Sequence, residues 1–167
     1  MKLYIITFEG STTIDKCVER YKELGYDPII YQGKSIVKDN IPSSKVAYIN
    51  YRTLLNEIDY NSDILISEDD AYLNEKIVIE NTKEINWLGY WAVRKTLGVM
   101  GGMLLYFPKN KIENISHLLN TSKPVHLDMF LDRFLDFILR PKTITKEIEH
   151  YSLIVKKIRK HKNVIKI

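Results

Sequence analysis

The sequence contains little cysteine and no long apolar run. Cys17 is the only cysteine among 167 residues, which excludes an internal disulfide bond and a metal site built from cysteines. The unbroken apolar stretches, such as residues 4–6 and 64–66, are only a few residues long. Because a membrane-spanning helix needs roughly 18–20 apolar residues, we expect none. The helical spacing around Cys17 predicts a buried structural thiol.

The first residues lack the pattern of a secretory signal peptide. A strand-like segment follows Met1 directly, without the charged start, apolar middle and small-residue cleavage site that such a signal has. We therefore expect a cytoplasmic protein, in the host cytoplasm if the source is viral.

Negative charge is the scarcer sign, although the imbalance is modest. The formal net charge is +4 and the pI about 9.0, and much of the excess lies in the basic residues 156–162. Such a run is typical of a solvated helix face. It also suits contact with an anionic partner, such as a phosphate-bearing substrate, a membrane surface or nucleic acid.

The hydrophobic pattern predicts a single α/β domain. A chain of this length, with 45% hydrophobic residues, can form one domain with a core of two or three layers. Residues 2–7 and 27–31 read as strands on either side of a helix over residues 11–24, with Ser11 or Thr12 as N-cap and Gly25 ending it. This β-α-β opening predicts two parallel strands joined by a right-handed crossover.

The remaining elements continue the same alternation. The pattern predicts helices over residues 46–58, 111–119 and 127–139, and strands over residues 63–67, 86–91, 103–107 and 143–148. Residues 94–102 are expected to form a loop. The predicted fold is therefore a single-domain α/β sandwich with a central, mostly parallel sheet over residues 1–152, followed by a basic C-terminal helix or tail over residues 153–167.

Three adjacent carboxylates, Glu68, Asp69 and Asp70, follow the predicted strand 63–67. They repel one another unless a cation neutralises them, and ligands of open α/β sheets bind at this end of the strands. Oxygen ligands suit Mn²⁺ or Mg²⁺, which complete their shell with water and substrate phosphates. The alternative is an exposed turn that places acidic groups at the start of a helix over residues 72–79.

Six segments occur in an order that resembles glycosyltransferase family 25, the lipooligosaccharide and procollagen galactosyltransferase group, and related viral sugar transferases. The most specific is Asp63-Ile64-Leu65-Ile66-Ser67-Glu68-Asp69-Asp70-Ala71, an apolar strand that ends in Glu-Asp-Asp. The others are the opening strand and helix (residues 4–7 through 19–26) and residues 48–58, 87–90, 101–108 and 124–128. The resemblance covers roughly residues 1–152. It implies a GT-A fold, which is a nucleotide-binding α/β sandwich.

The resemblance also implies roles for several residues. The end of the first strand, at Thr7, would meet the donor nucleotide. Asp70 is the first choice as metal ligand, while Glu68 and Asp69 would help to bind the metal or the donor ribose. His150 would complete the metal site, as a late histidine does in GT-A enzymes; its alternative is a surface histidine.

Four further residues have a chemical reason to belong to the site. Asp128 is the candidate general base for the acceptor hydroxyl, or else a helix N-terminal aspartate. Arg94 can neutralise a departing diphosphate, or lie in a solvated loop. Gly101 and Gly102 let a backbone approach a sugar closely, although a tight turn explains them too.

The sequence thus predicts a metal-dependent glycosyltransferase that uses a UDP- or GDP-linked sugar. Its acceptor would be a carbohydrate or, as for some viral enzymes, a modified nucleic-acid base. A metal-dependent phosphotransferase or nuclease is a second possibility, since an acidic rim also polarises phosphates. A non-catalytic nucleic-acid-binding module is a third, because of the basic tail. A homodimer is left open.

Overall fold

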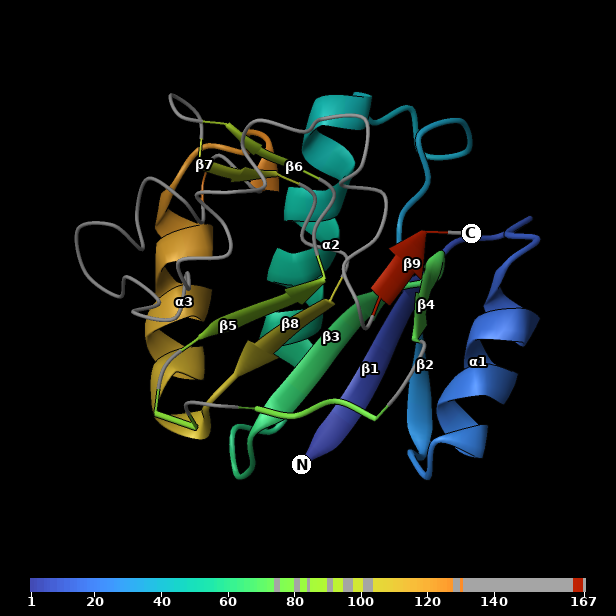
Figure 1. Ribbon diagram of the computed structural model, residues 1–167. Helices are drawn as coiled ribbons and strands as arrows, with labels where there is room; N and C mark the ends of the chain where they lie inside the picture. Colours follow the sequence, from blue (N-terminus) through green and yellow to red (C-terminus); the bar gives the residue numbers. More distant parts are fainter. Residues whose placement is uncertain are drawn as a thin grey trace.

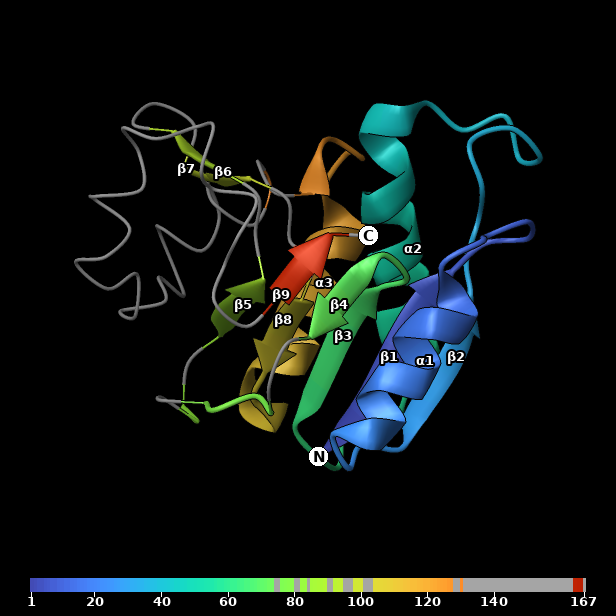
Figure 2. The same ribbon diagram turned by 45° about the vertical axis from the view of Figure 1, so that its right-hand side comes forward.

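The computed structural model of the protein is shown in Figures 1 and 2. It describes residues 1–73, 76–79, 82–83, 85–89, 92–94, 98–100, 104–127, 130 and 164–166. In chain order, the elements are β1 (Lys2–Thr7), α1 (Ile14–Glu23), β2 (Pro28–Gln32), α2 (Ser43–Glu57), β3 (Ile64–Glu68), β4 (Ala71–Leu73), β5 (Asn86–Gly89), β6 (Ala92–Arg94), β7 (Gly98–Met100), β8 (Leu104–Phe107), α3 (Lys109–Thr121) and β9 (Val164–Lys166).

The central sheet has the strand order β2-β1-β3-β8-β5. β1 pairs in parallel with both β2 and β3, whereas β8 is antiparallel to β3 and to β5. It follows that β2, β1, β3 and β5 run in one direction and β8 runs in the other. The predicted single-domain α/β sandwich with a mostly parallel sheet is therefore confirmed.

Helices cover both faces of this sheet (Figures 1 and 2). On one face, Tyr4 and Ile66 belong to a buried cluster with side chains of α2 and α3. On the other, Ile5 and Leu65 pack in a second cluster with Tyr21 of α1. Successive side chains of a strand point to opposite faces, so strands covered on both sides need apolar residues at every position. This explains the continuous apolar runs of β1 and β3.

The end of α1 shows how a local signal sets a boundary. Gly25 has a φ of 81°, the left-handed conformation that glycine adopts at low cost. The Tyr26 N–H donates to the Tyr21 carbonyl at 3.0 Å, and the Gly25 N–H donates to the Lys22 carbonyl at 2.9 Å. This is the Schellman pattern that satisfies the last carbonyls of a helix. At the other end, the N-cap is Thr13 rather than the predicted Ser11 or Thr12.

Four short strands differ from the sequence predictions. Ala71–Leu73 form β4, where the alternative for the acidic triplet placed the start of a helix. β6 and β7 pair as an antiparallel ribbon, and β7 together with the last residue of β6 lies in the segment 94–102 predicted as a loop. Val164–Lys166 form β9, antiparallel to β4, in the segment predicted as a helix or tail. Strands of three residues carry too little periodicity to be recognised, and β9 depends on a partner far away in the chain.

The predicted helix 127–139 and strand 143–148 lie outside the described residues, apart from Leu127 and Phe130, which are both buried. The boundary at residue 152 stays a prediction. Within the described part of the chain, no helix has the length and apolar character needed to cross a membrane.

Cys17 is fully buried, as predicted, and its thiol donates to the Ala71 carbonyl at 3.6 Å. Burial, and then the nearby charges of Asp69 and Asp70, raise the pKa of Cys17 to about 12, because both disfavour the thiolate. The thiolate is the reactive form. We therefore expect native protein at pH 8 to leave Cys17 unmodified by an aromatic disulfide reagent, while urea-unfolded protein reacts fully. Equal rates in the two states would contradict this placement.

Candidate functional site

The carboxyl ends of β1, β2 and β3 lie at the same edge of the sheet, because the three strands are parallel neighbours. A cavity of about 470 Å³ lies at this edge. Four segments line it: residues 6–9 at the end of β1, residues 34–37 after β2, residues 46–51 of α2 through four of their side chains, and residues 68–70 at the end of β3. This is the place where open α/β sheets bind ligands.

The acidic turn, residues 68–70, supplies one wall of the cavity. Glu68, Asp69 and Asp70 all line it, so the structure brings the predicted carboxylates together at the predicted edge. Asp69 is only 8% exposed, and its Oδ2 accepts a 2.7 Å hydrogen bond from the hydroxyl of Thr7, which is 4% exposed. A hydroxyl that donates to a carboxylate makes a strong hydrogen bond. Thr7 therefore holds the acidic turn against the end of β1.

A layer of buried polar groups supports the acidic turn from the side of α1. The Tyr21 hydroxyl lies 2.8 Å from Ser67 Oγ, which itself donates to the Glu68 carbonyl at 2.9 Å. Because Ser67 has a single hydroxyl hydrogen, Tyr21 is the donor to Ser67. Burial raises the pKa of Tyr21, so this donor stays protonated across the neutral range. Together with the Cys17 contact to Ala71, these bonds connect α1 to both ends of the turn.

An apolar wall completes the cavity. It consists of Phe8, Ile36, Val37, Val46, Ala47 and Tyr51. Three of these are exposed although they are apolar: Phe8 is 45%, Ile36 48% and Val37 93% exposed. Mostly apolar walls with a few converging polar groups are typical of small-molecule sites. Uncovered apolar groups at such a place indicate a surface that a ligand covers.

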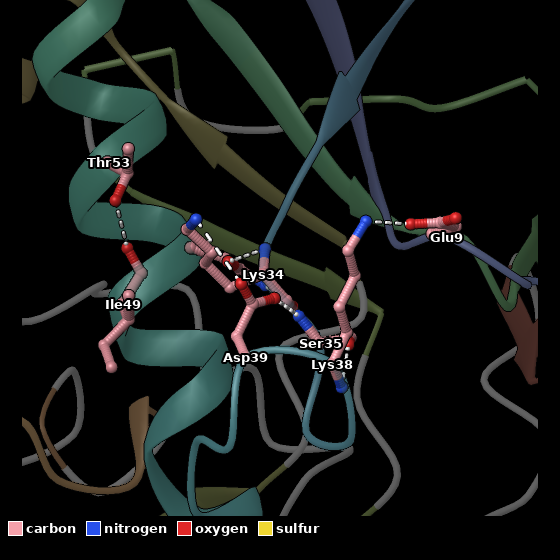
Figure 3. Close-up of polar contacts among 8 residues, drawn as sticks. Glu9, Lys34, Ser35, Lys38, Asp39, Ile49 and Thr53 are labelled. Carbon is pink, nitrogen blue, oxygen red and sulfur yellow. Dashed lines mark hydrogen bonds and ion pairs between the residues drawn. The ribbon is translucent and has the colours of Figure 1, made fainter.

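The described lining of the cavity is strongly acidic. It carries four carboxylates, Glu9 and the three of the acidic turn, and one ammonium group, that of Lys34. Lys34 Nζ lies 3.4 Å from Asp39 Oδ1, and Lys38 pairs with Glu9 (Figure 3). A phosphate-bearing ligand would meet net repulsion here. A divalent cation would reduce that repulsion.

A metal at the acidic turn would have to be shared with a ligand, because the described protein groups do not enclose one. Within the described ranges, no group of three or more His, Cys, Asp or Glu side chains could hold a metal ion. Asp69 accepts a hydrogen bond from Thr7, and the metal-binding roles of Glu68 and Asp70 stay predictions. Mg²⁺ commonly takes one or two carboxylates and completes its shell with water and substrate phosphates.

Several predicted site residues are not placed. Arg94 is the last residue of β6, and its side chain is not described. Gly101, Gly102, Asp128 and His150 lie outside the described residues, so their roles stay predictions.

Sequence reasoning missed two contributors to the cavity, the segment after β2 and the polar residue Asn50 of α2. The signal in the sequence that could have identified them was the polar character of Asn50. It is a polar residue on the helix face that also carries Leu54, and it is only 7% exposed.

The site is therefore an acidic and apolar cavity at the carboxyl edge of an α/β sheet. No family model matches the sequence, and no curated protein matches it. Membership of glycosyltransferase family 25 thus stays a prediction.

Similar solved structures include two glycosyltransferases. One, involved in the glycosylation of the major capsid of PBCV-1, has 12% identity and a TM-score of 0.45, covering 72% of this chain and 66% of its own. The other, the bifunctional glycosyltransferase WbbM, has 10% identity and a TM-score of 0.46, covering 80% of this chain and 37% of its own. This chain thus spans less than two thirds of the length of either.

A third similar structure is the inositol-1-phosphate CTP transferase from T. maritima. It has 10% identity and a TM-score of 0.44, and the match covers 94% of this chain and 78% of that one. Because the identities and TM-scores are this low, no activity, substrate or partner is transferred from these three structures to this chain.

Replacing Thr7 by Val should destabilise the protein, because Asp69 would stay buried without its donor. We expect a loss of about 1–3 kcal/mol in the free energy of unfolding, measured with urea. The control is Thr53→Val on α2, whose hydroxyl donates to the Ile49 carbonyl (Figure 3). That carbonyl lies inside a helix, so the control should stay within about 0.5 kcal/mol of wild type. Equal losses of unfolding free energy in the two variants would show that the Thr7–Asp69 bond stabilises the protein no more than the Thr53 bond does.

Proposed function

We propose that this protein is a glycosyltransferase that moves a sugar from a nucleotide-sugar donor to an acceptor hydroxyl with the help of a divalent metal. The observation that carries this proposal is the cavity at the carboxyl ends of β1 and β3, with the acidic turn on one side and the apolar wall on the other. The α/β sandwich agrees with the GT-A fold that the resemblance to family 25 implies.

The two walls suit the two halves of a nucleoside diphosphate. The apolar wall, with the aromatic side chains of Phe8 and Tyr51, offers a surface for a nucleobase. Carboxylates accept hydrogen bonds from ribose hydroxyls and also ligate hard cations. A volume of about 470 Å³ lies in the range of small-molecule sites, roughly 300–1,000 Å³.

Glu68 and Asp70 are the residues that would hold Mn²⁺ or Mg²⁺, with His150 as a further predicted ligand. When bound, such a metal neutralises charge that develops on the departing diphosphate. The protein's own part is to keep the two carboxylates in place. The bond from Thr7 to the Asp69 side chain and the bond from the Ser67 hydroxyl to the Glu68 carbonyl do this by restraining the acidic turn.

The transfer step itself would use residues from the second half of the chain. In an inverting reaction, the Asp128 carboxylate takes the proton of the acceptor hydroxyl as its oxygen bonds to the anomeric carbon. The bond from that carbon to the diphosphate oxygen breaks, and the electron pair leaves on the diphosphate. Arg94 would face this leaving group, and Gly101 and Gly102 would let the backbone approach the sugar. The acceptor is proposed to be a carbohydrate or a modified nucleic-acid base.

The direct test is to mix the purified protein with Mn²⁺ and a panel of UDP- and GDP-sugars, and to follow thermal stabilisation and donor hydrolysis. Stabilisation by at least one nucleotide sugar, dependent on the metal, is the expected result. Binding of nucleoside triphosphates alone would instead indicate nucleotidyl transfer. Salt-dependent binding of DNA would favour a nucleic-acid acceptor.

Asp70→Ala should impair sugar transfer without impairing folding. Its thermal stability without metal should equal or exceed that of wild type, because one of three neighbouring carboxylates is removed. Stabilisation by Mn²⁺ plus nucleotide should disappear, and transfer should fall by on the order of a hundredfold or more. The control is Asp27→Ala, just before β2 at the opposite edge of the sheet, which should behave as wild type. Full metal-dependent nucleotide binding by Asp70→Ala would contradict the assigned role.

Asp128→Asn tests the acceptor step alone. Because the proposed metal and nucleotide contacts are untouched, donor binding measured by calorimetry should be unchanged. Turnover should slow by roughly a hundredfold or more, the scale of losing a positioned general base. Loss of donor binding with normal turnover at saturating donor would show that Asp128 belongs to the donor site instead.

A further inference from the structure

Asn50 joins α2 to the segment that follows β2. Its side chain accepts a hydrogen bond from the Lys34 N–H at 2.7 Å through Oδ1, and donates one to the Lys34 carbonyl at 3.1 Å through Nδ2. A side-chain amide has both the acceptor and the donor that this two-point contact requires, whereas a carboxylate has only acceptors. Asn50 thus binds the backbone of one residue at both of its polar groups.

Gly33 makes this contact possible. A Cβ at residue 33 would lie 2.8 Å from Asn50 Nδ2 and 2.9 Å from Asn50 Cγ, closer than carbon atoms tolerate. The glycine is therefore required by the close approach of the amide. Gly33 and Asn50 form one unit, although they are far apart in the sequence.

The segment held by Asn50, residues 33–40, is also closed on itself (Figure 3). The Ser35 N–H donates to Asp39 Oδ2 at 2.7 Å, and the Lys38 N–H donates to Ser35 Oγ at 2.9 Å. The Ser35 N–H lowers the pKa of Asp39, and the charge of Lys34 adds to this effect. The segment, which we call loop 33–40, therefore has internal hydrogen bonds that do not depend on its attachment to α2.

Loop 33–40 is connected to the acidic turn through Thr7. The Gly33 N–H donates to the Thr7 carbonyl at 2.7 Å, while the Thr7 hydroxyl donates to Asp69 at 2.7 Å. Thr7 of β1 therefore links loop 33–40 to the acidic turn, and Asn50 links the loop to α2. No step in this chain of contacts is a solvent-exposed ion pair, so salt has little effect on it.

We propose that Asn50 is a positioning residue that fixes loop 33–40 in the wall of the cavity and so sets the site's affinity for the donor. Lys34, Ser35, Ile36 and Val37 line the cavity from this loop. Asn50 acts on the ligand through their placement rather than as a catalytic residue. The nature of the ligand rests on the proposed function, whereas the attachment of the loop does not.

Asn50→Ala is compared with Asn56→Ala as a matched control. Asn56 lies on the same helix, but its side chain bonds to Asn120 and Ser116 of α3, away from the loop. We expect trypsin to cut native Asn50→Ala after Lys34 and Lys38 about tenfold faster than wild type, since two anchoring hydrogen bonds are lost. Hydrogen exchange of the Lys34 amide should accelerate similarly. Asn56→Ala should change neither.

The kinetic readout separates positioning from a general loss of structure. For Asn50→Ala, KM for the donor should rise roughly tenfold while kcat stays within about twofold, because the loop contributes to binding and not to the reacting atoms. For Asn56→Ala, both parameters should match wild type.

A double-mutant cycle tests the mechanism without relying on one variant. Gly33→Ala alone should loosen the loop as Asn50→Ala does, because the added methyl group displaces the amide. In the Asn50→Ala background the same methyl group meets no amide, so Gly33→Ala should add less than about twofold. Asn50→Asp, which keeps the size but loses the donor, serves if Asn50→Ala does not fold.

Unchanged trypsin cleavage and amide exchange in Asn50→Ala would overturn the proposal, whether or not the wild type binds a nucleotide sugar. Independent effects of Gly33→Ala and Asn50→Ala would overturn it too. A loosened loop with an unchanged KM would show that the loop does not set donor affinity. If the wild type bound no nucleotide sugar, the proposed function would fail, while cleavage and exchange would still decide the attachment of the loop.

Discussion

The site of this protein depends on the parallel pairing of β1 with both β2 and β3. Parallel neighbours end at the same edge of a sheet, so the residues after each strand converge without any further constraint. Loop 33–40 and the acidic turn flank β1 for this reason, and Thr7 at its end can bond to both. If β1 ran antiparallel to both neighbours, Thr7 would lie at the opposite edge of the sheet from loop 33–40 and the acidic turn.

The acidic turn shows how the fold maintains an unfavourable charge arrangement. Adjacent carboxylates repel one another, and the hydrogen bonds from Thr7 and Ser67 to the turn, together with the bond from Cys17 to the adjoining Ala71, oppose its rearrangement. These partners come from β1, β3 and α1, so contacts from several elements of the domain offset the repulsion among the carboxylates. Residues that hold a site in this way are found at sites whose geometry must exist before the ligand arrives.

The different contacts of the three acidic residues could not be predicted from the triplet alone. Sequence position suggested similar roles for Glu68 and Asp69, but the structure engages Asp69 with the buried Thr7 hydroxyl. The charge of the cavity is also a tertiary property. Glu9 and Lys34 follow different strands and meet the acidic turn only because those strands are neighbours.

Periodicity in the sequence determined the α/β class, the β-α-β opening, the end of α1 at Gly25 and the acidic edge of β3, because these depend on patterns of a few neighbouring residues. Tertiary structure alone decided the contact of Asn50 with Gly33 and Lys34, the short strands β4 and β9, and the apolar wall. Each of these joins residues that are distant in the chain. The partner that makes such a contact favourable is specified by the packing of the whole domain, which no local window of sequence contains.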